Sequence, residues 1–140
     1  MVDLVTHQDQ EGVKMEIYKF DPIIYPYKLW VIINNSPIGI EEKFNEYSGK
    51  PIEFIDRDTI NHEAFTMPVI SKENPEYGVI IFLRTRKGMS FELIAHESSH
   101  AAKYLFEHIG ADMKVHEPFE YTIGWIAGCC EKAKRRKVNI

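Results

Sequence analysis

The stretch FELIAHESSHAAKYLFEHIG, residues 91–110, indicates most about the fold and chemistry of this chain. Its apolar residues recur at helical spacing, and Ser90 and Gly110 are typical of a helix start and a helix end. The apolar residues form two stripes, one of Ile94, Ala101, Leu105 and Ile109 and another of Phe91, Ala95, Ala102 and Phe106. A helix with apolar residues on two sides is mostly buried, so the stretch predicts the central helix of a small domain.

The same helix contains His96-Glu97-Ser98-Ser99-His100. Residues four apart lie on one helix face, about 5–6 Å from each other, so His96 and His100 can direct ring nitrogens at one metal ion. Glu97 is rotated by about 100° from His96, where its carboxylate can reach a water without being a ligand. The competing explanation is a solvated helix with two incidental histidines. Because these polar residues are costly on a buried helix without a partner, the pattern predicts one Zn²⁺ per chain and a hydrolase-type site.

A catalytic zinc site usually has three protein ligands, so one ligand has to come from elsewhere. His108 lies about 12 Å beyond His100 along the helix, too far to share the ion. The position six after His100 is Phe106, which excludes the class of site with a third histidine at that spacing. The candidates that remain lie near the start of a second helix, in the order Glu117, Glu120, His116.

This second helix is expected from about Pro118 to residue 136, alongside the first. One stripe along it contains Glu117, Tyr121, Gly124 and Gly128. We expect the two glycines to let the helices approach closely, with Glu117 at the metal end of the contact and Glu120 at its edge. Favourable charge in a first helical turn is the competing explanation for each carboxylate.

The rest of the chain predicts an α+β domain with a small mixed β-sheet packed on these two helices. Residues 13–20, 29–33 and 77–84 have strand-like patterns, and the second of these is expected to be buried on both faces. Shorter strands are expected at 51–55 and 67–70. An amphipathic helix is expected at 40–47.

Length and composition indicate one domain over residues 1–140, with 1–12 disordered or a short edge segment. A net charge of −4 argues against nucleic-acid binding, and the basic run KAKRRK is better explained as favourable charge at a helix C-terminus. No apolar run approaches the roughly 20 residues that span a bilayer. With no signal peptide and only the adjacent Cys129 and Cys130, we expect a soluble cytoplasmic protein. The oligomeric state stays open.

The motif His96-Glu97-x-x-His100, followed by a glutamate on the next helix, resembles the zincin metallopeptidases, specifically their glutamate-ligand (gluzincin) branch. The small size is similar to that of compact zincin-like proteins of phages and mobile elements. Residues 77–130 carry the resemblance. It implies zinc bound by His96, His100 and Glu117, water activated by Glu97, and a peptide or protein substrate in a cleft walled by strand 77–84.

Two features depart from the larger gluzincins. Tyr121 stands where an acidic residue is usual, and Pro118 interrupts the usual pattern. The large helical lobe that closes their cleft has no counterpart in this chain. These departures weaken the assignments of the third ligand and of the substrate, and leave the histidine pair unaffected.

The expectation is therefore a zinc metallopeptidase in which Glu97 takes a proton from water and passes it to the leaving amine. Tyr121, His116 and Tyr104 are candidates for stabilising the oxyanion. The alternative is a catalytically silent zincin-like protein with a binding, structural or regulatory role, of phage or mobile-element origin. An intact Glu97 argues against this alternative, and the small size argues for it, because little chain remains to shape a pocket. A DNA-associated peptidase, suggested by the basic run, is a third possibility that salt-dependent binding would test.

Overall fold

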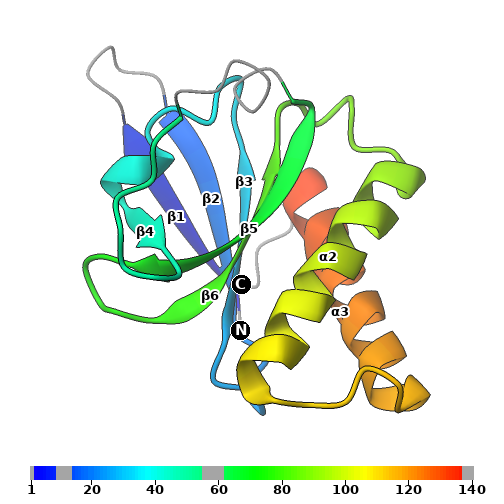
Figure 1. Ribbon diagram of the computed structural model, residues 1–140. Helices are drawn as coiled ribbons and strands as arrows, with labels where there is room; N and C mark the ends of the chain where they lie inside the picture. Colours follow the sequence, from blue (N-terminus) through cyan, green and yellow to red (C-terminus); the bar gives the residue numbers. More distant parts are fainter. Residues whose placement is uncertain (1, 9–13, 55–61, 137–140) are drawn as a thin grey trace.

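A computed structural model describes residues 2–8, 14–54 and 62–136 of the chain (Figure 1). In chain order, the elements are β1 (Val2–Gln8), β2 (Lys14–Phe20), β3 (Lys28–Ile33), the 3-10 turn η1 (Ile40–Glu42), β4 (Phe44–Glu46), β5 (Ala64–Ser71), β6 (Tyr77–Leu83), α2 (Phe91–Ile109) and α3 (His116–Lys134). The α+β class and the mixed sheet packed on two helices are confirmed. Within the described residues, no helix is both long and apolar enough to span a membrane.

The described strands form one sheet in the order β1-β2-β3-β6-β5-β4. β3 and β6 are parallel neighbours at its centre, and the other neighbouring strands are antiparallel. Gly78 of β6 lies so close to β3 that an added Cβ would stand 2.3 Å from the carbonyl oxygen of Lys28. This strand pairing therefore requires glycine at position 78.

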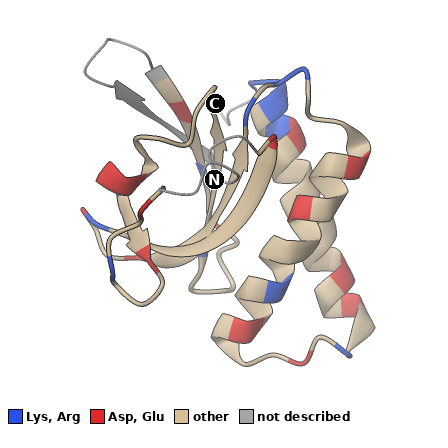
Figure 2. Ribbon diagram, turned by 45° about the horizontal axis from the view of Figure 1, so that its top comes forward, with Lys and Arg blue, Asp and Glu red and all other residues tan. Residues whose placement is uncertain are grey.

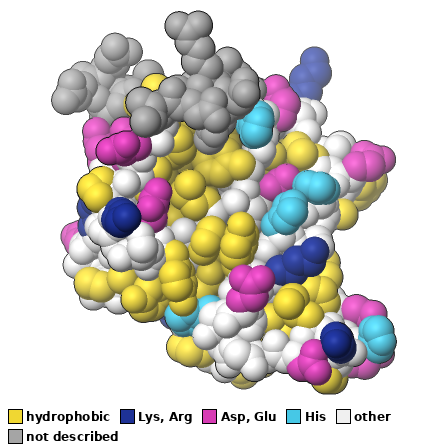
Figure 3. All heavy atoms as spheres, viewed as in Figure 1, with side chains coloured by type: hydrophobic (Ala, Val, Ile, Leu, Met, Phe, Trp, Pro, Cys, Tyr) yellow, Lys and Arg dark blue, Asp and Glu magenta, His cyan; other side chains and the backbone are white. Residues whose placement is uncertain are grey.

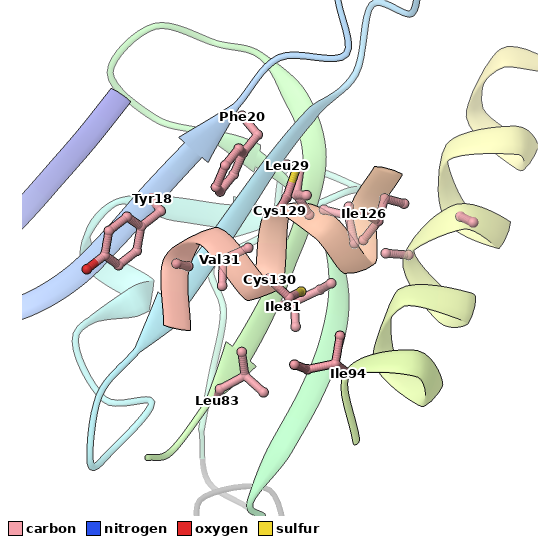
Figure 4. Packing of buried hydrophobic residues seen from close by; sticks show 14 of the residues in the cluster. Tyr18, Phe20, Leu29, Val31, Ile81, Leu83, Ile94, Ile126, Cys129 and Cys130 are labelled. Atoms are coloured by element: carbon pink, nitrogen blue, oxygen red, sulfur yellow. The ribbon is translucent and has the colours of Figure 1, made fainter. Parts of the chain in front are cut away.

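Each face of the sheet is covered by an apolar layer. On one face, side chains of β2, β3 and β6 pack against α2 and α3, with Val31, Ile81, Ile94 and Ile126 in the contact (Figure 4). On the other face, the segment around η1 and β4 supplies the cover. There the rings of Trp30 and Phe44 meet with centroids 4.9 Å apart. The double cover explains the nearly continuous apolar sequence of β3, predicted as a strand buried on both faces.

Helix α2 has the capped ends that its sequence predicts. Leu93 donates its backbone N–H to the Ser90 side chain, and Gly110 adopts the left-handed conformation, with a φ of 70°. After the turn, α3 packs along one flank of α2, where the rings of Phe106 and Phe119 meet at 5.2 Å. The two helices thus form an antiparallel pair on the sheet (Figure 1).

The basic turn before α2 is tied to the end of α3. Arg86 donates hydrogen bonds to the carbonyl oxygens of Ala133 and Lys134 at 3.3 and 3.1 Å. The Lys134 ammonium in turn donates to the carbonyl oxygen of Met89 at 2.8 Å. The Arg86 bonds reach carbonyl groups in the last turn of α3, and the Lys134 bond joins that turn to the loop before α2, so part of this basic cluster has a structural role.

Several local predictions need correction. The helix predicted at 40–47 is wrong, because this segment forms η1 and then β4, whose Phe44 pairs with Ser71 of β5. Ile40 and Phe44 have helical spacing, yet they reach the same apolar layer from a turn and a strand. The strand at 51–55 is reduced to a bridge between Pro51 and Asn45, with residue 55 outside the described residues.

Other boundaries moved less. The strand expected at 67–70 is longer and spans Ala64–Ser71. Of residues 1–12, Val2–Gln8 forms the edge strand β1, so the expectation of an edge segment is the correct one for that stretch. Residues 1 and 9–12 lie outside the described residues. The second helix begins at His116, two residues before the predicted start.

Candidate metal and hydrolase site

His96 and His100 lie side by side on the exposed face of α2. Figure 3 shows two neighbouring histidine side chains on the surface over this helix. Their Nε2 atoms are 3.1 Å apart and their ring centroids 4.7 Å apart. Two imidazole nitrogens bound to a tetrahedral zinc at about 2.0–2.1 Å would be about 3.3 Å from each other. The pair therefore fits a shared zinc ion. A hydrogen bond between the two rings would give a similar distance.

Glu97 is fixed between α2 and the sheet and is only 6% exposed. The Thr66 hydroxyl, on β5, donates to Glu97 Oε1 at 2.7 Å and lies 3.3 Å from the Glu97 carbonyl oxygen. The hydrogen bond to Oε1 holds the carboxylate against β5. Sequence reasoning missed Thr66, because a lone threonine on a strand gives no signal of what it contacts across 31 residues.

The structure does not bring the predicted third ligands to the histidines. Glu117, Glu120 and His116 are exposed in the first turns of α3, where the His116 and Glu120 side chains lie 3.8 Å apart. Across the described parts of the chain, no three His, Cys, Asp or Glu side chains are grouped closely enough to hold a metal. Glu117 as the third ligand, with Glu120 as second choice, stays a prediction.

The packing of α2 explains this separation. Ser98 lies against Cys130 of α3, whereas Glu97 contacts β5. Successive helical residues are about 100° apart, so His96 is rotated by about 200° from Ser98. The histidines thus occupy the flank of α2 that faces away from α3, and a third ligand from α3 would have to cross the helix.

The stripe Glu117, Tyr121, Gly124 and Gly128 faces solvent, so its predicted contact with α2 is wrong. A Cβ added at either glycine would meet no atom within 4 Å, and Tyr121 is 74% exposed. The buried face of α3 consists instead of Thr122, Ile126, Cys129, Cys130 and Ala133. Both stripes have helical spacing, and the one with more apolar side chains is buried because it removes more apolar surface from water.

The strand that contacts Glu97 is β5, whereas the resemblance implies β6 as the cleft wall to which a peptide adds. β6 has β3 on one side and β5 on the other, so its edge is not available to a peptide. β5 pairs with β4 only over Val69–Ser71, and the described residues place no strand beside Ala64–Pro68 on that side. Among the described residues, this part of β5 is therefore a sheet edge, and its Thr66 contacts Glu97.

One hydrogen bond shows which β5 residues direct their backbone groups toward β6 and which direct them to the other side. The Arg84 N–H donates to the Glu63 carbonyl oxygen at 2.9 Å, which places position 63 among the residues bonded toward β6. Because bonding direction alternates along a strand, Ala64 and Thr66 direct their backbone groups to the open side. Pro68, which has no N–H to donate, also falls on that side.

The three predicted oxyanion residues are dispersed. Tyr121 and His116 project from α3 into solvent, and Tyr104 packs against the helix-side core two turns beyond Glu97 on α2. Within the described residues, no hydrogen bond joins any of them to Glu97, His96 or His100. Their assignment as oxyanion donors also stays a prediction.

The interior behind the motif is apolar. Burial raises the pKa of the Cys130 thiol to about 12, although the neighbouring Ser98 hydroxyl lowers it somewhat. Burial raises the pKa of Cys129 to about 12 as well. Both cysteines therefore remain neutral thiols at physiological pH and do not act as thiolate ligands or nucleophiles.

No protein-family model, no curated protein and no solved structure matches this chain, so the geometry of His96, Glu97 and His100 is the evidence on its function.

Proposed function

We propose that this chain is a zinc-dependent peptide hydrolase, with His96 and His100 as metal ligands and Glu97 as the general base. The observation that carries the proposal is the 3.1 Å separation of the two Nε2 atoms on an exposed helix face. Glu97, the residue after His96, is held by a hydrogen bond from Thr66 of β5. Imidazole nitrogen is a preferred zinc ligand, so the donor type fits as well. Zinc bound there would supply the Lewis acidity that polarises a peptide carbonyl.

Glu97 takes the proton of the attacking water and passes it to the leaving amine. Thr66 holds Oε1, and no described residue forms a hydrogen bond with Oε2, so Oε2 is the oxygen for this transfer. The low exposure of Glu97 limits competition from bulk water. Thr66 thus positions the base and does not take part in the proton transfer itself.

The open edge of β5 supports a peptide as the substrate. An extended peptide laid along Ala64–Pro68 would form main-chain hydrogen bonds with Ala64 and Thr66. Thr66 also contacts Glu97, so a peptide in this register would pass directly by the base. Main-chain recognition of this kind suits a small domain, because it needs few side-chain pockets.

The decisive test combines zinc binding and hydrolysis in the same variants. We expect wild-type protein to bind one zinc per chain and to cleave members of a broad peptide library. His96→Ala and His100→Ala should lose both properties, whereas Glu97→Gln should keep zinc and lose cleavage. His62→Ala, which alters an exposed histidine outside the motif, is the matched control and should change neither. Cleavage by Glu97→Gln would refute the assigned role of the base.

The same measurements decide the third ligand. The sequence predicts that Glu117→Ala loses zinc, whereas the exposed positions of both glutamates on α3 favour an unchanged zinc affinity in Glu117→Ala and Glu120→Ala. Loss of zinc in Glu117→Ala, comparable to that in His96→Ala, would instead establish the ligand expected from the sequence. Loss only in Glu120→Ala would move the ligand to that position.

The alternative is a catalytically silent protein with the same metal site. The burial of Glu97 and its hydrogen bond to Thr66 favour it, since a carboxylate with a structural role would have these properties too. Stoichiometric zinc without cleavage of any library peptide would favour this alternative over the hydrolase.

A further inference from the structure

The outward face of α3 is an unpartnered helix face with a regular pattern. Six residues at steps of four and three occupy it, and they are called the outward stripe here: Glu117, Tyr121, Gly124, Gly128, Glu131 and Arg135. The stripe points away from both α2 and the sheet, and its centre is open, because a Cβ at either glycine would meet nothing within 4 Å. The contacts that fold the domain therefore do not account for it.

Apolar side chains gather along one side of the outward stripe. Tyr121 and Trp125 border a groove of about 340 Å³ that the loop before β3 closes from its far side with Ile24 and Tyr25. Ile23 and Ile24, at the tip of this loop, are 77% and 78% exposed. A patch of this kind on a soluble domain indicates an interaction surface.

The loop presents these isoleucines in a costly conformation. Ile23 has a φ of 70°, which is rare for a β-branched residue. Asp21 stabilises this conformation by accepting the Ile23 N–H at 2.8 Å, and Lys28 holds Asp21 at 2.6 Å. The loop is thus held in a conformation that keeps apolar side chains at the surface.

The residues at the two ends of the outward stripe, Glu117 and Arg135, carry opposite charges. Glu117 stands in the first turn of α3 and, within the described residues, has no ion-pair partner. Arg135 stands just past the last turn and is 61% exposed, with Glu131 of the same chain at 2.8 Å. Figure 2 shows acidic residues where α3 begins and basic residues where it ends. Such a face is complementary to itself when a second copy runs in the opposite direction.

We propose that a second copy of this chain packs antiparallel on the outward face of α3, about a twofold axis between Gly124 and Gly128. Positions 117 and 135 are equally distant from the midpoint of the two glycines, so Glu117 of each copy meets Arg135 of the other. By the same symmetry, Tyr121 lies opposite Glu131 and Gly124 lies opposite Gly128. Such a contact uses the same patch on both copies, as in most homodimers.

The physical basis is close approach combined with aromatic burial. Glycines at the crossing let two helix axes come as near as about 8 Å. A helix laid along the stripe also covers Tyr121 and Trp125, residue types that dominate the energetics of interfaces. The two Glu117–Arg135 pairs fix the direction of packing more than they add affinity.

The test is sedimentation of the full chain over a range of concentrations. We expect wild type to form a dimer, and Tyr121→Asp to weaken it by at least about tenfold. Glu107→Asp and Glu107→Arg, on the exposed face of α2, are controls that should leave the dimer unchanged. Far-UV circular dichroism should show equal folding of all variants, since the altered side chains are exposed.

Charge reversal gives the sharper readout. Glu117→Arg and Arg135→Glu should each weaken the homodimer, because each places like charges together twice. Mixing the two variants should restore dimers, since every contact in the mixed pair then joins opposite charges. A monomer at all concentrations would overturn the proposal. So would a dimer that Tyr121→Asp leaves unchanged, or single variants that mixing does not rescue.

Discussion

The two helices have the same length, 19 residues each, yet their sequences predicted their surroundings with different success. For α2, both predicted ends agree with the structure, and His96 and His100 share an exposed face. The predicted second apolar stripe is only partly correct, because Phe91 and Ala95 are exposed. For α3, the stripe with Glu117 and the two glycines is predicted to contact α2 and faces solvent instead. α2 has a Ser90 cap and a strongly apolar side, whereas α3 starts at Val115 without a side-chain cap and mixes small and polar residues around its axis. Periodicity identifies a face reliably only when the other faces are clearly polar.

The largest effect should come from breaking the buried face of α3. Ile126→Ala removes a fully buried side chain between the helices and the sheet, and should lower the free energy of unfolding by about 2–5 kcal/mol. Urea denaturation measures it. The matched control is Lys132→Ala, on an exposed face of the same helix, which should stay within about 0.5 kcal/mol of wild type. Equal effects of the two changes would contradict the orientation of α3.

The next effect tests the flank of α2 that faces β5. Thr66→Val keeps the shape of the side chain and leaves Glu97 without its hydroxyl donor, so stability should fall by about 1–3 kcal/mol. Thr122→Val is the control, because its hydroxyl donates only to the Pro118 carbonyl oxygen within α3 and should cost less. If Thr66→Val is silent in denaturation, the anchoring of Glu97 is not as described.

The pH dependence of stability tests whether Cys129 and Cys130, on the inner face of α3, are buried. Their pKa values are raised from 9.0 to about 12 by burial, so between these values the folded state binds more protons than the unfolded state. Stability should therefore be unaffected below pH 9 and fall as the pH rises above it, by at most about 1.4 kcal/mol per pH unit for each thiol. Denaturation between pH 8 and 10.5 checks this. The variant with Cys129→Ala and Cys130→Ala should show a shallower decline, and an equal decline would contradict the burial of the thiols.

The smallest effect tests whether Gly124 and Gly128 of the outward stripe face solvent or contact α2. Measured at concentrations where the chain is monomeric, Gly124→Ala should stabilise α3 by about 0.5–1 kcal/mol, because alanine is the better helix former and the site is open. In a close helix–helix contact, the added methyl group would clash and destabilise. The thermal midpoints of Gly124→Ala and Gly128→Ala, compared with wild type, decide the matter.

Local sequence signals were strong enough to predict part of the candidate site. The spacing of His96 and His100 on a capped helix required that their rings share a face, and the structure has them 3.1 Å apart at Nε2. Glu97 could be placed beside them on the same grounds. Its anchor, Thr66, could not be predicted, because that contact depends on which strand docks against α2. The position of the third-ligand candidates relative to the histidines could not be predicted for the same reason, since it depends on which flank of α2 is covered by α3.

The sequence by itself determined the α+β class, the three main strands, both helices and the histidine pair, because each of these depends on spacing within one segment. Only the tertiary structure decided that β5 lies beside the motif, that residues 40–47 form a turn and a strand, and that Glu117 faces solvent. Each of those outcomes depends on which helix faces and strand edges become buried. The free energy that decides this is a sum of contributions from residues far apart in the sequence. A short segment specifies its own periodicity, whereas its partner is chosen by the whole fold.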